Sequence, residues 1–227
     1  MKTRRNAAAL LLLMAVTLTG CSAPAEADPV ARIKHVQVAA RALAGGDDLR
    51  GGLIDAPAGF TPVAVASSHN GKVSIGGGSF PGCPALEPMT TDETTSAAVT
   101  YAKGVMGPYL THAIVKFPAG QAVEAMTRLR GTVDSCKAFD QQLAGVSVKF
   151  SLAATQPPAG LGDDAAGLRM TGSTDIGIDV VADIVAVRRG DVVIWLNDTT
   201  IGTDPAGLAG SLAAGAAQRC HEKITGC

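Results

Sequence analysis

Residues 179–197, DVVADIVAVRRGDVVIWLN, decide the fold of this chain. Two runs rich in Val, Ile and Ala flank Gly190-Asp191, a pair that favours a tight turn. The stretch therefore predicts a hairpin of strands 179–189 and 192–197. The second run is apolar at every position from Val192 to Leu196, as expected of a strand buried on both faces. We therefore place it in the centre of an antiparallel sheet.

Four further segments outward from this hairpin have the composition of strands. Each is bounded by Gly or Pro turn signals, such as the Pro118 that ends one run and the Pro157-Pro158-Ala159-Gly160 bend after another. Residues 51–88 are rich in Gly and Pro, so loops and short strands are expected there. The four predicted strands are residues 97–103, 110–117, 146–152 and 165–171.

Apolar residues at intervals of three and four predict three helices. The first spans residues 30–43, the second begins after Pro118 and runs for about twenty residues, and the third is capped by Asp204 with Pro205 at its first position. The fold class is therefore α+β: an antiparallel sheet of about six strands with two or three helices packed on it, in a single domain of residues 32–227. The inner positions are Ala122, Val123, Met126, Leu129, Val133, Cys136 and Phe139 in the second helix and Leu208, Leu212, Ala216 and Cys220 in the third.

The first twenty residues have the pattern of an export signal. A basic start, Met1–Arg5, precedes the apolar run Ala7–Leu18, which is too short to span a membrane. The ending Leu18-Thr19-Gly20-Cys21 resembles the bacterial lipobox, so we expect cleavage before Cys21 and attachment of lipid (diacylglyceryl, palmitate) to its thiol. An ordinary secretory signal with a chance cysteine is the alternative. Residues 1–20 are thus predicted to be a lipoprotein signal peptide and residues 21–31 a lipidated tether.

These assignments place the domain at the cell membrane, lipid-anchored on its extracytoplasmic face in the cell envelope. Without residues 1–20 the chain has a net charge of −4, which argues against nucleic acid as a partner. The expected partners are the membrane, through the lipid, and a small-molecule or cell-wall ligand, with a protein partner as a further option. No cofactor is expected.

Four cysteines remain once Cys21 carries lipid, and four cysteines allow three pairings. Export to an oxidising space favours disulfides. Cys220 and Cys227 are close in sequence, so we pair them, which leaves Cys83 with Cys136. A metal site is the alternative, but these cysteines lack Cys-x-x-Cys spacing and His221 alone adjoins one of them. No metal ligand is therefore assigned.

No motif identifies a catalytic residue. Histidines occur at positions 35, 69, 112 and 221, and neither a Gly-x-Ser-x-Gly elbow nor a Ser-x-x-Lys pair is present. The run Gly76-Gly77-Gly78 lacks the frame of a phosphate-binding loop, and the carboxylates of Asp163-Asp164 and of Asp175 and Asp179 lack calcium-loop spacing. We expect no enzyme activity.

Two further features have structural interpretations that outweigh the functional ones. Arg189-Gly190-Asp191 matches a cell-adhesion tripeptide, but Gly-Asp is ordinary turn chemistry. Trp195, the only tryptophan, is expected to fill the core rather than line a cleft. Tyr101, Tyr109 and His112 are candidates for the edge of such a cleft, although no ligand-binding residue is assigned from the sequence.

Five short motifs follow one another along the chain: Pro57-Ala58-Gly59-Phe60, Cys83, Phe117-Pro118-Ala119, Val133-Asp134-Ser135-Cys136 and Val187-Arg188-Arg189-Gly190-Asp191-Val192-Val193. Their order resembles the extracellular sensor domain of PknH-type serine/threonine kinases of mycobacteria, which also occurs in actinobacterial lipoproteins. The resemblance covers roughly residues 40–220. It implies an antiparallel sheet with packed helices, disulfides and a cleft for a ligand.

Three functions follow as hypotheses. The first is a cell-envelope lipoprotein whose sensor-like domain binds a small molecule or envelope component, which requires a concave pocket with a few polar groups. The second is a structural or protein-interaction lipoprotein, which requires exposed apolar surface. The third is a hydrolase, which requires a nucleophile, a histidine and an acid brought together in space.

Overall fold

The fold is taken from a computed structural model that describes residues 47–69, 82–83, 86, 94–143, 146–202 and 207–227. The predicted signal peptide, Cys21, the tether and the helix at 30–43 lie outside the described residues, as do Gly76-Gly77-Gly78 and the cap at Asp204-Pro205.

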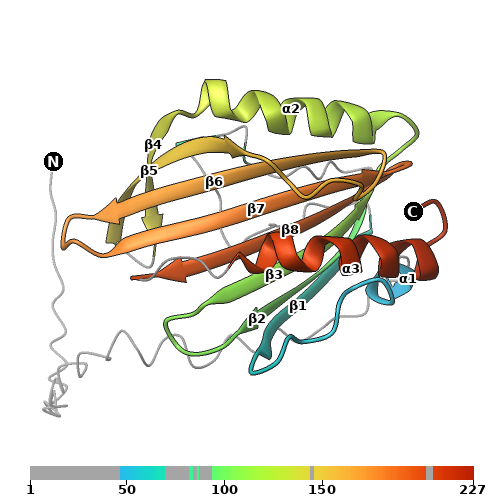
Figure 1. The fold of residues 1–227 in the computed structure, drawn as a ribbon, viewed down its shortest axis with the longest axis horizontal. Helices are drawn as coiled ribbons and strands as arrows, with labels where there is room; N and C mark the ends of the chain where they lie inside the picture. The colour runs from blue at the N-terminus through green and yellow to red at the C-terminus, as the bar shows by residue number, and fades with distance from the viewer. Residues whose placement is uncertain (1–46, 70–81, 84–85, 87–93, 144–145, 203–206) are drawn as a thin grey trace, which may run out of the picture. The chain divides into compact units, whose positions relative to one another are not determined.

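An eight-stranded antiparallel sheet forms the centre of the described structure (Figure 1). Its order is β1-β2-β3-β8-β7-β6-β5-β4, so only the step from β3 to β8 joins strands distant in sequence. The predicted hairpin is confirmed as β7 and β8, and β8 lies in the interior of the sheet with all of residues 192–198 buried. The bounds are β1 Thr61–His69, β2 Thr95–Ala102, β3 Tyr109–Lys116, β4 Ala138–Leu143, β5 Val146–Thr155, β6 Asp164–Thr174, β7 Asp179–Arg189 and β8 Val192–Ile201.

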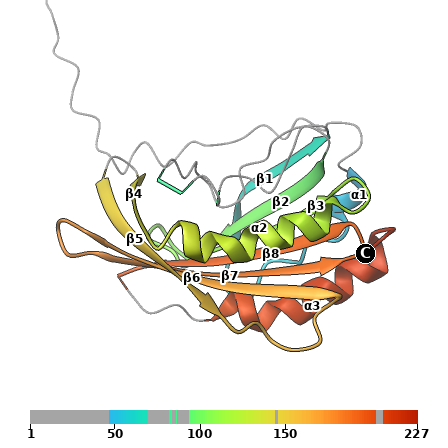
Figure 2. The same ribbon diagram turned by 90° about the horizontal axis from the view of Figure 1, so that it is seen from above.

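Within the described residues, three helices accompany the sheet: α1 Asp47–Arg50, α2 Gln121–Ser135 and α3 Leu208–Lys223. Figures 1 and 2 show α2 and α3 on opposite sides of β6, β7 and β8. α2 packs on β5, β6 and β7, α3 packs on β7 and β8, and α1 packs on β2. We call the two sides of the sheet the α2 face and the α3 face.

Each face has its own hydrophobic core because side chains alternate along a strand. On the α2 face, Met126 and Leu129 of α2 pack with Trp195 of β8 and with aliphatic side chains of β5, β6 and β7. On the α3 face, a stripe of small residues lets α3 approach β7 and β8 closely. This stripe is Ala209, Ala213, Ala216, Ala217 and Cys220, with Leu208 and Leu212 half-buried beside it.

The sheet has eight strands rather than the predicted six or so, because β4 was missed and β1 was not assigned individually within residues 51–88, where short strands were expected. β1 contains Pro62, which an edge strand tolerates, and its register shifts between Pro62 and Ala64. β4 has the polar sequence AFDQQL, and its phenylalanine continued the helical spacing that precedes it. In the structure Phe139 instead stacks on Phe150 of β5, with ring centroids 5.6 Å apart. Tertiary packing therefore overrides the local pattern.

α2 is correspondingly shorter than predicted, with 15 residues. It ends at Ser135, and the Cys136 N–H donates to the Thr132 carbonyl. The exposed fraction of Val123 is 51%, and Val133 is half-buried, whereas Ala125 and Thr132 are buried. The buried face of α2 is thus rotated slightly from the predicted one.

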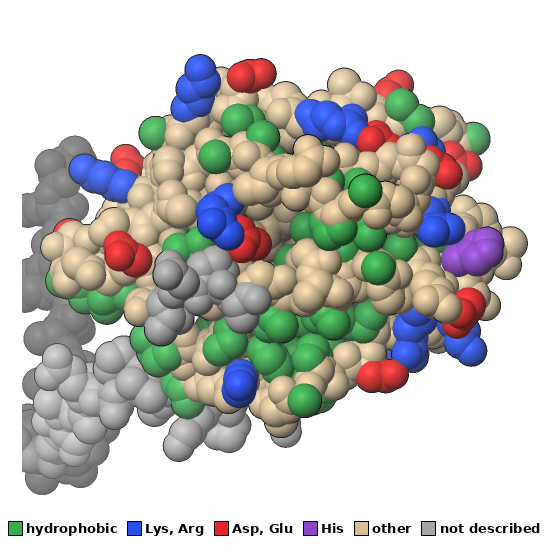
Figure 3. Space-filling view, in the orientation of Figure 1, with side chains coloured by type: hydrophobic (Ala, Val, Ile, Leu, Met, Phe, Trp, Pro, Cys, Tyr) green, Lys and Arg blue, Asp and Glu red, His purple; other side chains and the backbone are tan. Residues whose placement is uncertain are grey.

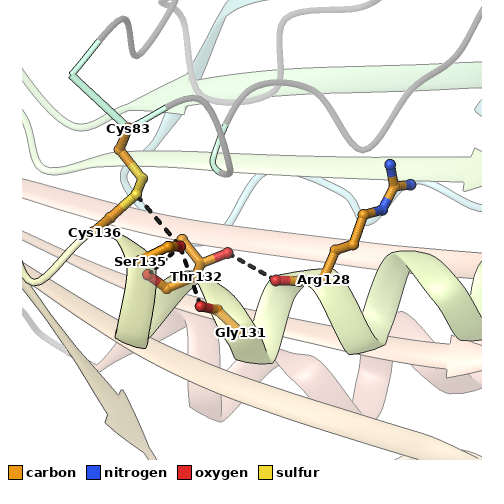
Figure 4. Close-up of a disulfide and its surroundings, with 6 residues drawn as sticks. All are labelled: Cys83, Arg128, Gly131, Thr132, Ser135 and Cys136. Carbon is orange, nitrogen blue, oxygen red and sulfur yellow. Dashed lines mark hydrogen bonds between the residues drawn. A yellow bond between two sulfur atoms is a disulfide. The ribbon is translucent and has the colours of Figure 1, made fainter.

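Both predicted disulfides are formed. Cys83–Cys136 joins the end of α2 to the segment at residues 82–83, and Cys220–Cys227 closes the C-terminal turn onto α3. Figure 4 shows the first bond beside Ser135, whose hydroxyl donates to the Gly131 carbonyl at the last turn of the helix. Cys83 and Cys136 are both buried, so this crosslink is part of the core on the α2 face.

Gly172 of β6 leaves room for the Phe150 ring, so a larger residue at this position should destabilise the protein. A Cβ at this position would lie 2.4 Å from the Phe150 ring. We expect Gly172→Ala to lower the free energy of unfolding by about 1–3 kcal/mol through overpacking. The matched control is Gly131→Ala in α2, where a Cβ meets nothing within 4 Å and where we expect a gain of about 0.5–1 kcal/mol. Urea unfolding measures both, and equal effects would contradict the packing argument.

Candidate ligand-binding site

Half of the α3 face is left without a helix. α3 packs on β7 and β8, so the neighbouring strands β5 and β6 have no helix over this face. Their alternate side chains are exposed and polar, whereas those on the α2 face are buried. The exposed set on β5 and β6 is Ser147, Lys149, Ser151, Arg169, Thr171 and Ser173. The sequence thus places hydrophilic residues where the sheet meets solvent.

An open concavity of about 610 Å³ lies on this uncovered area. Side chains from three strands line it together with glycine backbone, and most of the lining groups are hydroxyl or charged. The lining residues are Lys149, Ser151, Thr171, Gly172, Ser173, Asp179, Val181 and Gly202. We call this set the polar concavity, and it is the candidate site.

Strand pairing sets the arrangement of these groups. Lys149 of β5 pairs with Ser173 of β6, and Ser173 pairs with Asp179 of β7, so a cation, a hydroxyl and an anion form one row across the sheet. In the next row the hydroxyls of Ser151 and Thr171 lie 2.7 Å apart and are hydrogen-bonded. The concavity therefore offers one positive end and one negative end, with one hydroxyl between them and two more in the adjacent row.

The charges inside and around the concavity are partnered differently. Arg169 donates two hydrogen bonds of 2.7 Å to the Asp183 carboxylate, so these two charges satisfy each other. No ion pair is recorded for Lys149 or Asp179 within the described ranges, which makes both charges available to a ligand. Figure 3 shows acidic and basic side chains interspersed over the visible face, without a continuous patch of one sign.

Asp198 of β8 supports the neighbouring end of α3. It is fully buried, and its Oδ2 accepts the Leu208 N–H at 2.9 Å, at the first turn of the helix. Burial raises the pKa of Asp198, and the adjacent Asp183 carboxylate raises it further, whereas the Leu208 N–H lowers it. This carboxylate therefore positions the helix that borders the concavity.

Exposed hydrophobic side chains gather at the same end of the sheet as the concavity. The β2–β3 and β6–β7 turns and the first residues of β5 lie at this end, which we call the tip end, because the strands alternate in direction. The exposed fractions are 63% for Val105, 59% for Met106 and 70% for Ile176. Val63 and Val146 are also exposed there, so the tip end combines apolar and polar contact groups.

Two smaller hollows each have an arginine in their lining that is paired with an aspartate, and the first is also lined by Glu222 and Lys223. One of about 500 Å³ lies between α3 and the segment after α1, where Arg219 donates to Asp55 at 2.6 Å. The other, of about 280 Å³, lies between α2 and the ends of β5 and β6, where Arg130 is bonded to Asp164. The polar concavity is the larger space, and its charges are unpaired within the described residues.

The aromatic and histidine candidates do not form a cleft. Trp195 is 6% exposed in the core on the α2 face, as predicted. Tyr101 and His112 are buried on the α3 face, where the Tyr101 hydroxyl donates to the Ile54 carbonyl at 2.7 Å and His112 Nδ1 accepts the Ile54 N–H at 3.0 Å. Tyr109 lies on the α2 face. The suggested cleft edge is therefore wrong, because neighbouring residues of a strand point to opposite faces.

The turn and acidic motifs have structural contacts. Arg189 donates through Nε to the Leu161 carbonyl, and Asp191 accepts the Gly120 N–H, so Arg189-Gly190-Asp191 is tied to the fold. Asp163 accepts the Gly190 N–H at 2.7 Å. Asp179 instead lines the concavity. Across the described parts of the chain, no cluster of three or more His, Cys, Asp or Glu has metal-binding geometry.

The described histidines do not assemble a catalytic triad. His112 Nδ1 is occupied by the Ile54 N–H, and burial, with a contribution from Arg219, lowers the pKa of His112 to about 3. His221 contacts the Cys227 carbonyl. Neither residue has a recorded bond to a nucleophile or an acid, while His35 lies outside the described residues and the side chain of His69 is not described.

Sequence reasoning assigned none of the concavity's residues to a ligand. A usable signal was present in residues 146–152, where Ser147, Lys149 and Ser151 alternate with Val148, Phe150 and Leu152. This alternation indicates a strand with one solvated face. What the pattern lacks is the identity of the neighbouring strands that complete the site.

Comparison with solved structures supports the fold assignment. The chain matches the extracellular domain of PknH from Mycobacterium tuberculosis with a TM-score of 0.52, and the match covers 72% of this chain and 85% of that one. The chain has the fold of a PknH-type sensor domain. Sequence identity is 16%, so the likeness to the PknH-type domain concerns the fold alone. No protein-family model and no curated protein matches the chain.

The sequence resemblance and the structural comparison indicate the same fold. The solved structure is that of the extracellular domain of PknH, and this chain shares its architecture. None of the helices described here is both long and apolar enough to cross a membrane. The architecture agrees with the one that the sequence resemblance implied.

Proposed function

We propose that this chain is a lipid-anchored envelope protein whose PknH-type domain binds a small polar ligand in the polar concavity. The observation that carries the proposal is the row Lys149–Ser173–Asp179, because it places unpaired charges and a hydroxyl on one open surface of the sheet. Binding sites combine a concave surface with a small number of placed polar groups. The role is binding rather than catalysis.

The second part of the proposal is a lipid anchor on Cys21. Cys21 follows a lipobox-like sequence, and lipid on its thiol would hold the domain at the extracytoplasmic face of the cell membrane. The two disulfides of the domain suit an oxidising compartment. Metabolic labelling with a palmitate analogue tests the anchor: wild-type protein should be labelled and Cys21→Ser should not.

Native mass spectrometry of the protein purified from its own envelope tests the binding function. We expect a small molecule to be retained by the wild type and lost from Thr171→Trp, because the indole fills the concavity. The matched control is Thr127→Trp, which places the same side chain on an exposed position of α2. Equal retention by the two variants, or no retained molecule in any of the three proteins, would contradict the proposal.

A protein-interaction role is the second candidate, and the tip end favours it. Val105 and Met106 are adjacent, exposed and apolar on the β2–β3 turn. If they contact a protein partner, crosslinking in intact envelopes should recover one stoichiometric partner, and the double substitution Val105→Ser/Met106→Ser should abolish its recovery. The matched control is Val123→Ser on α2, away from the tip end. Unchanged recovery with the tip substitutions would exclude this surface.

A further inference from the structure

We infer that the ligand of the polar concavity is a short dipolar peptide, bound with its terminal carboxylate at Lys149 and its terminal ammonium group at Asp179. This inference rests on the proposed function and names the ligand class of the same site. Its first basis is charge: each end of the row carries one charge of opposite sign, and neither has a recorded ion pair within the described ranges.

Spacing gives the length of the ligand. Lys149 and Asp179 are separated by one intervening strand, β6, so their backbones are two strand spacings apart, or about 10 Å. An extended peptide advances about 3.3–3.6 Å per residue, so three residues span about 10 Å. A tripeptide therefore matches the distance between the two charges, whereas a single amino acid is too short to reach both.

The middle of the concavity suits the backbone of such a peptide. Peptide groups present N–H donors and carbonyl acceptors, and a hydroxyl can serve either kind of group. Ser173 supplies a hydroxyl between the two charges, and the hydrogen-bonded hydroxyls of Ser151 and Thr171 lie in the row beside it. Gly202, which also lines the concavity, has no side chain to obstruct a ligand, and Gly172 lines it with backbone atoms. The lining therefore combines a partner for each terminal charge with hydroxyl groups that can bond to the peptide backbone.

The charge balance disfavours ligands of a single sign. A polyanion would meet the Asp179 carboxylate, and a polycation would meet the Lys149 ammonium group. Asp140 of β4 pairs with Lys149 on the far side of the row and does not line the concavity. It adds negative charge behind the lysine, so a ligand with more than one carboxylate is disfavoured further.

A charge-exchange experiment with trialanine as the probe tests the inference by calorimetry at low salt. Lys149→Glu and Asp179→Lys should each weaken binding about fivefold, the upper range for an exposed ion pair. The double variant Lys149→Glu/Asp179→Lys should restore affinity, because the peptide can bind in the reverse direction. Matched controls are Lys137→Glu and Asp134→Lys, which reverse charges that do not line the concavity and should leave the affinity unchanged.

Capped peptides and stereoisomers complete the test. N-acetylated trialanine and trialanine amide should each bind more weakly than the free peptide, since each lacks one terminal charge. The affinities of trialanine and of a tripeptide that ends in two D-alanines are then compared. Tighter binding of trialanine indicates a peptide derived from protein, and tighter binding of the D-alanine peptide indicates one derived from the cell wall. The inference of a dipolar ligand is wrong if free and capped peptides bind with equal affinity. It is also wrong if the double variant loses as much affinity for trialanine as the two single variants lose together.

The inference and the proposed function can fail separately. If envelope-purified protein retains a molecule that Thr171→Trp loses, and that molecule has no paired terminal charges, the concavity is a binding site and the peptide inference is wrong. If no molecule is retained and trialanine does not bind, both are wrong. Retention of a dipolar molecule that is displaced by trialanine supports both.

Discussion

Removing the Cys83–Cys136 disulfide is expected to lower the free energy of unfolding by about 4 kcal/mol. The bond joins residues 53 positions apart, so it restricts a long loop of the unfolded chain. It also fixes the end of α2 to residues 82–83, where a Cβ at Gly82 would lie 2.5 Å from the Asp140 carbonyl of the edge strand β4. The crosslink therefore holds a segment closely against the edge of the sheet.

The double substitution Cys83→Ser/Cys136→Ser, unfolded in urea, measures this loss. The matched control is Cys220→Ser/Cys227→Ser, which opens a bond between residues only 7 positions apart and should cost about 2 kcal/mol. If the two double variants lose the same free energy, loop length does not govern the contribution of these disulfides.

Acidification is expected to destabilise the protein through His112. Burial lowers the pKa of this imidazole to about 3 from its ordinary value of 6.5. The unfolded chain therefore takes up a proton below pH 6.5 that the folded protein does not bind. The contribution of neutral His112 to stability is fully present above pH 6.5 and is lost as the pH falls toward 3. Between pH 7 and pH 5 the loss should be about 2 kcal/mol.

His112→Asn provides the control for this pH dependence. An amide oxygen can accept the Ile54 N–H in place of Nδ1, and the amide does not titrate in this range. The difference in unfolding free energy between pH 7 and pH 5 should therefore shrink by about 2 kcal/mol in the variant. An unchanged pH dependence would show that His112 is accessible to protons in the folded state.

Asp198 has the opposite effect on the pH dependence of the unfolding free energy. Its pKa is raised by burial, so its contribution to stability is present below its ordinary pKa and is lost as the pH rises through the folded value. Acidification thus favours the folded state at this carboxyl while it disfavours it at His112. Asp198→Asn should remove this opposing contribution and steepen the acid destabilisation.

The polar concavity is exposed because α3 packs on β7 and β8 and leaves β5 and β6 uncovered on this face. A longer α3, or one packed over β6, would bury the polar row that now faces solvent. Lys149 and Asp179 line the concavity and have no recorded ion pair within the described ranges, so an ion pair of the fold does not account for their charges. The exposed apolar turns at the tip end add a second contact surface beside it.

Much of the fold could be predicted from local pattern. The Val- and Ile-rich hairpin around Gly190-Asp191 has short-range turn chemistry and a buried second strand, so its place inside the sheet followed directly. Cysteine spacing indicated both disulfides. The edge strands were harder to predict from the sequence. β4 has a polar sequence, and its Phe139 is stabilised in the strand by stacking on Phe150 of the neighbouring strand.

The sequence by itself therefore determined the α+β class, the central strand and the cysteine pairs, since each depends on residues close in sequence or on a count. The tertiary structure alone decided which strands are neighbours and which face α3 covers. Lys149, Ser173 and Asp179 share one row only because β5, β6 and β7 pair in a particular register. That register arises from burial of the opposite face, where Phe150 packs on Gly172, and no local pattern records it.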